Sequence, residues 1–407
     1  MSRPRFPPEI FDLLIDLLRN NRGALKQCCL ISKSWISRAR KHLFAHIEFR
    51  SEDLDLWKRT FPDPARSPAH HARTLEIDLG EGDIEDGDWI QGFFRVERLF
   101  LSAMYTGVIS FAPFYKLSSS LIYLHVYSDV IHPQVFDLIH SLPLLEDLTL
   151  TGDGILHDDG FDGPQTVVPP STSPPLTGSL KIFLENGISS AARRLLNLPN
   201  GLHFREIRLG PSEEEELPLV SELVDACFDT LECLRITFLA SCKLVSTPHF
   251  IDYALQFLKS ATTAESASSP IDLSKATKLE EAAFWCHSAR IGWVVLTLKT
   301  ITPGHRNFRL ISIRLPSMLR RIIPSDAPLR IEAGSHGVEW SDLDLLLVQF
   351  WESHSIRPKI VCPWSRPVNS TRGAKDLVLY LLPESMKRGI LDLVDSEELQ
   401  LTSVLEL

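Results

Sequence analysis

Short apolar triplets of the form Leu-x-x-Leu-x-Leu recur along most of the chain, and they constrain its fold more than any other feature. They occur at Ala72/Leu75/Ile77, Val96/Leu99/Leu101, Leu121/Leu124/Val126, Leu145/Leu148/Leu150, Thr177/Leu180/Ile182, Phe204/Ile207/Leu209, Leu231/Leu234/Ile236 and Phe308/Ile311/Ile313, with a weaker copy at Leu279/Ala282/Phe284. The middle residues lie 24, 25, 24, 32, 27, 27, 48 and 29 positions apart. Because a unit of this size cannot bury its apolar face alone, such units must stack on one another.

A period in the twenties, with one strand-like triplet in each unit, is typical of leucine-rich repeats, in which a strand and a returning helix or loop form each unit. Segments with helical spacing lie between triplets, at 132–142, 218–228 and 247–258. The spacing of 48 equals two periods of 24, so we expect a degenerate repeat near residues 254–260. The predicted fold class is α/β, with a leucine-rich-repeat-like αβ solenoid. An open α/β sheet is the alternative.

Two segments interrupt the repeats, and the end of the chain departs from them. Residues 153–178 are rich in Pro, Gly and Ser and predict a loop insertion, which coincides with the longer spacing of 32. The acidic run 211–217 is expected to be solvated. In the last part, we expect a helix from about 341 to 353, a strand over 356–362 and a final helix over 386–394. These would form a C-terminal capping region over 331–407, after a solenoid over 51–330.

Charge and cysteine content limit the class of partner and the compartment. The net charge is -10, and residues 1–50 hold ten Lys/Arg and four Asp/Glu, so the remainder of the chain carries -16. A body of that charge repels phosphate backbones, which argues against nucleic-acid binding. The chain has seven cysteines and no Cys-x-x-Cys pair, which favours a reducing compartment, cytoplasmic or nuclear. No apolar run is long enough to predict a membrane span.

The first fifty residues predict a small helical unit. Pro7 and Pro8 pre-set a helix start, and Glu9 places a negative charge in the first turn, where the helix dipole favours it. An apolar stripe follows at helical spacing, formed by Ile10, Leu13, Leu14, Leu17 and Leu18. A second, shorter apolar face comes from Leu25, Cys28 and Cys29, and Ser32 can cap a third helix that carries Trp35, Ala39 and Leu43. Three short helices bury little surface, so we expect this unit to need a neighbour.

This stretch resembles an F-box. The matching residues are Phe6, Pro7, Pro8, Glu9, Ile10, Leu14, Leu18, Leu25, Cys28, Leu30, Ile31, Ser32, Lys33 and Trp35. It departs from the usual pattern in having Phe6 in place of the first Leu, and six residues between Leu18 and Leu25. An F-box is a trihelical module that docks substrate receptors onto the Skp-type adaptor of cullin ubiquitin ligases. The resemblance implies adaptor binding through Phe6, Pro7, Pro8, Glu9, Ile10, Leu14, Leu25, Leu30, Ile31 and Trp35.

Together with irregular leucine-rich repeats and the tail that contains LLVQFWESHSIRPK, the F-box makes the chain similar to the expanded F-box families of mushroom-forming fungi. The resemblance implies a substrate-recognition adaptor of an Skp/cullin/F-box ubiquitin ligase, with the F-box at 1–50. Cullin would then be reached through the adaptor, and the target protein is not identified. Two alternatives stay open: a repeat scaffold without a degradation role, and a sensor that holds a small molecule.

No motif in the sequence predicts catalysis or a cofactor. The phosphate-binding, zinc-protease and serine-hydrolase patterns are all absent. Asp153, Asp158, Asp159 and Asp162 cluster in the Gly-rich segment, but their spacing does not fit a calcium loop, so a solvated loop is the favoured reading. His70 and His71 have no third metal ligand nearby in sequence. The chain is therefore expected to be non-enzymatic.

Strand geometry places the target-binding surface. In each triplet the apolar residues point into the core, so the residues that flank the last one point to the opposite face of the strand. For the repeats centred on Leu99, Leu124 and Leu148, this rule predicts an aromatic-rich surface made of Arg98, Phe100, Tyr123, His125, Tyr127, Asp147 and Thr149. Aromatic and Arg side chains often dominate protein interfaces, so we expect the target to bind there.

Overall fold

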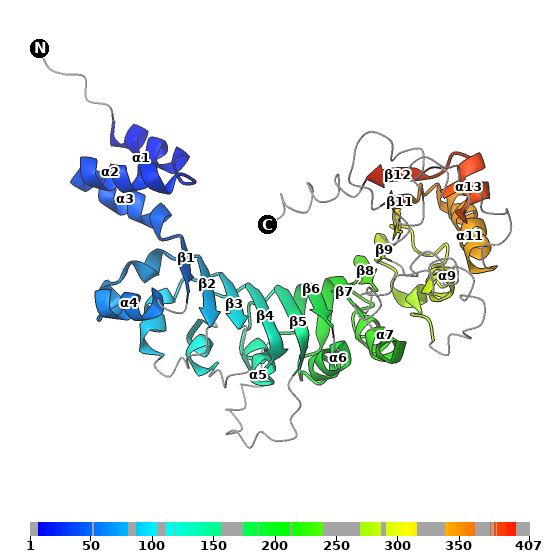
Figure 1. The fold of residues 1–407 in the computed structure, drawn as a ribbon, viewed down its shortest axis with the longest axis horizontal. Coiled ribbons are helices and arrows are strands. Elements are labelled where there is room, and N and C mark those ends of the chain that lie inside the picture. The colour runs from blue at the N-terminus through cyan, green and yellow to red at the C-terminus, as the bar shows by residue number, and fades with distance from the viewer. Residues whose placement is uncertain are drawn as a thin grey trace, which may run out of the picture. The chain divides into compact units, whose positions relative to one another are not determined.

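The computed structural model describes residues 7–50, 53–79, 87–103, 111–117, 119–155, 174–185, 187–211, 214–238, 269–285, 290–315, 338–362, 375, 378–379 and 381–395 (Figure 1). Contacts divide the chain into two compact units, one of residues 1–177 with 198–200 and one of residues 178–197 with 201–407. Several predictions fall outside the described residues: Phe6, Asp158, Asp159, Asp162, the degenerate repeat at 254–260 and the helix at 247–258.

The first unit begins with a group of short helices. They are α1 (Pro8–Leu17), α2 (Arg22–Ile31) and α3 (Lys33–Leu43). Asn21 caps α2 by accepting a hydrogen bond from the Ala24 backbone N–H at 3.0 Å, and Ser32 ends α2 and starts α3. The predicted start of the first helix and the predicted Ser32 cap of the third are both confirmed.

A sheet of parallel strands follows in the first unit. Its strands are β1 (His46–Phe49), β2 (Thr74–Leu79), β3 (Arg98–Ala103), β4 (Tyr123–Ile131) and β5 (Asp147–Ile155). The middle residues of successive triplets are register partners, in the order Leu75, Leu99, Leu124 and Leu148. The repeat phase read from the sequence is therefore confirmed. One strand was missed: β1 pairs with β2 through Ile47 and Leu75, so the sheet starts inside the range 1–50.

The connections in the first unit are short because a period of about 24 residues leaves little room after the strand. They are α4 (Asp53–Thr60), η1 (Pro64–Arg66), η2 (Pro68–His71), η3 (Asp88–Phe93), η4 (Ala112–Leu117) and α5 (Gln134–His140). Pro64 and Pro68 each stand at the start of a single 3₁₀ turn, where the missing N–H costs nothing. The helix expected within 132–142 is confirmed as α5.

The second unit continues the same alternation with longer helices. Its elements are β6 (Leu176–Leu184), α6 (Ile188–Leu196), β7 (Leu202–Leu209), η5 (Glu214–Glu216), α7 (Leu217–Asp225), β8 (Cys233–Thr237), η7 (Leu273–Lys275), β9 (Glu281–Trp285), α9 (Ile291–Lys299), β10 (Leu310–Arg314), α11 (Val338–His354), β11 (Lys359–Cys362), α13 (Pro383–Lys387) and β12 (Asp392–Asp395). Strands β7 to β12 pair in parallel in chain order. Figure 1 shows α6 and α7 on the same side of β6, β7 and β8.

The same backbone hydrogen-bond arrangement recurs at the start of several strands. The carbonyl oxygen of the residue just before a strand accepts two consecutive N–H groups of the next repeat. Arg73 O accepts from Glu97 and Arg98, Glu97 O from Ile122 and Tyr123, Ile122 O from Glu146 and Asp147, and Glu280 O from Arg309 and Leu310. The same arrangement in both units supports a leucine-rich-repeat-like α/β fold, because it shows that the units are equivalent in backbone as well as in apolar pattern.

Three expectations about the later repeats need correction. Strand β8 pairs directly with β9, through Leu234 with Ala282, so no strand lies between these two in the sheet, and the residues of the expected degenerate repeat lie outside the described ranges. The segment 386–394 is not a helix: α13 ends at Lys387, Gly389 turns with φ of 64°, and β12 follows. Strands β11 and β12 extend the sheet beyond β10, so the capping region at 331–407 contains further strand-and-helix units. The domain boundaries at 50 and 330 stay predictions.

The core of the sheet is made by the triplets. Leu99, Leu124, Leu180, Ile207 and Ile311 are fully buried, and the weaker copy at Ala282 and Phe284 is buried as well. Both bounds of the loop insertion predicted at 153–178 need correction, because β5 extends to Ile155 and β6 already begins at Leu176. The apolar residues of the triplets therefore serve packing, and the residues that alternate with them lie on the opposite face of the strands.

Candidate functional site

Helix α1 has two apolar faces, and only one of them is covered. The inner face holds Ile15, which is buried with Leu25, Cys28 and Ala39 of the neighbouring helices. The outer face holds Ile10, Leu13, Leu14 and Leu17, and we call these four residues the α1 stripe. All four are exposed, Leu13 to 59% and Leu17 to 80%. Four of the five residues of the predicted stripe therefore share one helix face, and that face points away from the core. The fifth, Leu18, follows the end of α1 and packs against the core instead.

The end of α2 presents a second exposed apolar pair, Leu30 and Ile31, which are 79% and 65% exposed. Pro7 and Glu9 are exposed near the start of α1. Leu25 was expected to contact the adaptor, but it is fully buried. It therefore holds the helices together and cannot contact a partner directly. Trp35 is partly buried, and its ring lies 5.1 Å from that of Phe11. Leu13 and Leu17 were not among the expected contact residues, although their helical spacing placed them on the same stripe.

A charged cluster fixes α1 against α3. Arg38 donates to Asp16 with Nε at 2.6 Å and also through a terminal nitrogen, and the His42 Nε2 atom lies 2.7 Å from Asp16 Oδ1. Hydrogen bonds from Arg38, and then from His42, hold the pKa of Asp16 well below its usual range. The ionised carboxylate therefore orients α1, and with it the α1 stripe.

The predicted recognition residues of the first unit lie side by side on adjacent strands. Arg98 is the register partner of Tyr123, and Phe100 is the register partner of His125. The Arg98 guanidinium lies 4.7 Å from the centre of the Tyr123 ring, and the Phe100 and Tyr123 rings lie 5.1 Å apart. Tyr127 is 43% exposed on the same strand as Tyr123. We call Arg98, Phe100, Tyr123, His125 and Tyr127 the β3–β4 aromatic cluster.

The β5 side of that surface differs from the expectation. Thr149 is only 7% exposed, so it is not available to a partner, and Asp147 is partly buried. The Nε2 atom of His125 lies 2.9 Å from the Oγ1 atom of Thr151, which also reaches the Val126 carbonyl oxygen. The β3–β4 aromatic cluster therefore does not extend onto β5.

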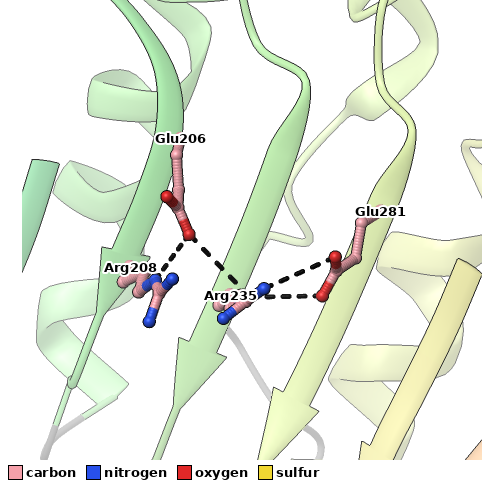
Figure 2. A network of polar contacts seen from close by, with 4 residues as sticks. All are labelled: Glu206, Arg208, Arg235 and Glu281. Carbon is pink, nitrogen blue, oxygen red and sulfur yellow. Dashed lines mark hydrogen bonds and ion pairs between the residues drawn. The ribbon is translucent and has the colours of Figure 1, made fainter. Parts of the chain in front are cut away.

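The second unit carries a polar network that the sequence reasoning missed. Figure 2 shows Arg235 of β8 between Glu206 of β7 and Glu281 of β9. The Arg235 Nε atom lies 3.2 Å from Glu281 Oε1 and 4.0 Å from Glu206 Oε1, and Arg208 Nε donates to the same Glu206 oxygen at 2.5 Å. The rule that located the β3–β4 aromatic cluster also finds these residues, because they flank the buried Ile207, Leu234 and Ala282.

Two cysteines of the second unit, Cys227 and Cys233, have poorly reactive thiols. Burial, and then the charge of Glu281, raise the pKa of the Cys233 thiol to about 12, and burial raises that of Cys227 to about 11. Neither thiol is a nucleophile at neutral pH, because a nucleophilic cysteine needs a depressed pKa. In this part of the chain no group of His, Cys, Asp and Glu could hold a metal ion. His70 instead bonds to the Ser67 carbonyl oxygen with Nδ1 at 2.9 Å.

Helix length and polarity also bear on membrane association. Within the described ranges, no helix is both long and apolar enough to cross a bilayer.

Comparison with protein-family models and with curated proteins found no match. Among solved structures, a leucine-rich-repeat protein of Leptospira interrogans is similar over 80% of this chain and 74% of that chain, with 13% sequence identity and a TM-score of 0.28. A likeness this distant carries no argument about function. The assignment of a leucine-rich-repeat-like fold therefore depends on the strand register and the repeated backbone hydrogen bonds described above.

Proposed function

We propose that this chain is a non-catalytic substrate receptor, in which the α1 stripe and the end of α2 dock onto an Skp-type adaptor of a cullin ubiquitin ligase. The observation that carries the proposal is the exposure of large apolar side chains on a very small helical unit. Soluble monomers rarely leave such side chains grouped on one helix face, and patches of this kind mark interaction sites. The choice of an Skp-type adaptor as the partner depends on the resemblance of residues 6–35 to an F-box.

The charge of the helical unit also fits this role. Residues 1–50 have a balance of ten Lys/Arg against four Asp/Glu, whereas the rest of the chain is strongly acidic. A basic docking unit attracts an acidic partner surface and speeds association. We propose residues 1–50 as the docking domain, 51–330 as the solenoid and 331–407 as the capping region.

Target recognition is proposed for the β3–β4 aromatic cluster. Its Arg and aromatic side chains contact one another before any partner arrives, which lowers the entropy cost of binding. Residues of these types dominate interface energies when they become buried. A receptor with this arrangement contributes proximity between the target and a ubiquitin-charged enzyme, and no bond chemistry of its own.

The docking proposal is tested by copurification. The full-length chain should bring down both the Skp-type adaptor and cullin when it is expressed in a fungal cell. Recovery of the adaptor without cullin would favour the scaffold alternative, in which the protein binds partners without a role in degradation. If neither protein is recovered, the F-box assignment is wrong.

The recognition surface is tested by replacing Phe100, Tyr123 and Tyr127 with Ala. We expect the amount of receptor-dependent ubiquitinated protein to fall to background. Adaptor binding should be unchanged, because the substitutions lie outside α1, α2 and α3. Ubiquitin-remnant mass spectrometry provides the measurement, and circular dichroism checks that the variant is folded. A target profile identical to that of the wild type would exclude this cluster as the recognition surface.

A further inference from the structure

A Trp–Arg pair lies on strands β9 and β10 of the second unit. Trp285 and Arg314 are register partners on β9 and β10. The Arg314 guanidinium carbon lies 4.2 Å from the centre of the Trp285 ring, within the range of a cation–π contact. The indole is 42% exposed, so the pair lies at the surface of the face that also carries the network of Figure 2.

The arginines of this face differ in how their charge is compensated. Arg208 pairs with Glu206, and Arg235 pairs with Glu281 (Figure 2). Arg314 forms no ion pair with any carboxylate in the described part of the chain. Burial without a compensating charge lowers the pKa of Arg314. The planar guanidinium has five N–H donors in a fixed fork, and stacking on the indole leaves its edges free to donate.

A second cation lies close to this pair. Lys359 of β11 is the register partner of Ser312, which is two residues before Arg314 on β10. With strands about 4.8 Å apart and a rise of about 3.3 Å per residue, such diagonal neighbours lie roughly 8 Å apart at Cα, within reach of two successive side chains on one face of an extended peptide. Lys359 is partly buried, and its register partner on β12 is the exposed Asp392, but no ion pair within 4.0 Å joins Lys359 to a carboxylate of the described residues. Trp285, Arg314 and Lys359 together form what we call the β9–β11 cation site.

We propose that the β9–β11 cation site binds an acidic segment of a partner protein, with a carboxylate on the Arg314 fork and an adjoining apolar side chain on the Trp285 indole. A carboxylate accepts two parallel hydrogen bonds from a guanidinium edge. It suits this part of the chain better than a phosphate does, because residues 51–407 carry a net charge of -16 and repel a doubly charged group more strongly. The site goes beyond adaptor docking and does not depend on it.

The test measures peptide binding to the full chain without adaptor. The probe is a short fluorescein-labelled peptide in which a leucine and two glutamates occupy alternate positions, so that all three side chains lie on one face of the extended peptide. Binding is followed by fluorescence anisotropy at low salt. We expect the glutamate peptide to bind at least tenfold more tightly than the same peptide with glutamines. A tenfold loss, about 1.4 kcal/mol, is expected for Arg314→Gln. Trp285→Ala should also weaken binding, because the indole platform is lost.

The matched control is Arg309→Gln, which removes the same charge just before β10. Arg309 is paired with Glu280 and is 76% exposed, so its loss should leave peptide binding unchanged. Arg314→Lys keeps the charge and loses the fork, and it should bind with an intermediate affinity even if Arg314→Gln is poorly folded. The proposal is overturned by equal binding of glutamate and glutamine peptides, by equal losses in the variants of Arg314 and Arg309, or by tighter binding of a phosphoserine peptide.

Discussion

Truncating two leucines of the α1 stripe tests the docking surface quantitatively. Leu13 is 59% and Leu17 is 80% exposed, and they lie one turn apart on the same face of α1. Burying a leucine side chain in an interface contributes about 1.5–3 kcal/mol to the free energy of binding. Truncation to Ala removes most of this contribution, in proportion to the part of the side chain that the adaptor covers. We expect Leu13→Ala with Leu17→Ala to weaken adaptor binding by about 2–3 kcal/mol, roughly 30- to 150-fold in Kd.

The same double variant should leave the stability of the free protein nearly unchanged. Both side chains are exposed before docking, and surface substitutions usually change the free energy of unfolding by less than about 0.5 kcal/mol. Isothermal titration of purified Skp-type adaptor gives the Kd, and thermal unfolding of the free chain gives the stability. The reasoning predicts a loss of affinity with no shift in Tm.

Two control variants separate docking from folding. Leu56 on α4 is 57% exposed but lies outside the α1 stripe, so Leu56→Ala should change neither Kd nor Tm. Leu25 is fully buried, so Leu25→Ala should destabilise the helical unit by about 2–5 kcal/mol. An unchanged Kd in the double variant, or an equal loss in Leu56→Ala, would refute docking through the α1 stripe.

Two further predictions concern how the docking helices and the sheet are held. The pKa of Asp16 is lowered in the folded state, so its stabilising contribution is present above the ordinary carboxyl pKa and is lost as pH falls below about 5. Asp16→Asn should lower Tm at pH 7 and make Tm decline less steeply as the pH falls. Asp12→Asn, on the same helix, should have neither effect. Identical profiles of Tm against pH for the two variants would contradict this. Gly152 has φ of 150°, and a Cβ there would lie 1.7 Å from the Ser128 carbonyl oxygen, so Gly152→Ala should cost about 2–4 kcal/mol in denaturant unfolding. Gly23 is the control: it lies in a helix, and a Cβ there would meet its nearest atom at 3.5 Å, so Gly23→Ala should stabilise the same unit slightly. If Gly152→Ala does not change the free energy of unfolding, β4 and β5 are not packed as described.

The apolar spacing was sufficient to locate most strands and their register. Because side chains alternate along a strand, a triplet such as Leu121/Leu124/Val126 settles which residues face the core, and the period aligns one triplet with the next. The position of the β3–β4 aromatic cluster followed from the same rule, without any knowledge of contacts. The first strand, β1, was missed because His46–Phe49 carries only two buried residues and directly follows a helix.

Other features depend on contacts that spacing does not contain. The sequence could not show which face of α1 is covered, because both its stripe and its inner face are apolar, and only packing of Ile15 against Leu25 and Ala39 leaves the stripe exposed. Nor could it show that β8 meets β9 directly, because a spacing of 48 fits either one long connection or two short repeats.

Charge pairing shows the same division between sequence and tertiary structure. The sequence determined which arginines flank the buried triplets, since that depends only on alternation along a strand. It did not determine which of them find a carboxylate, because Arg235 and Glu281 are 46 residues apart and meet only when β8 pairs with β9. Local spacing therefore decides which face a side chain occupies, and the pairing of distant strands decides whether its charge is neutralised or left for a partner.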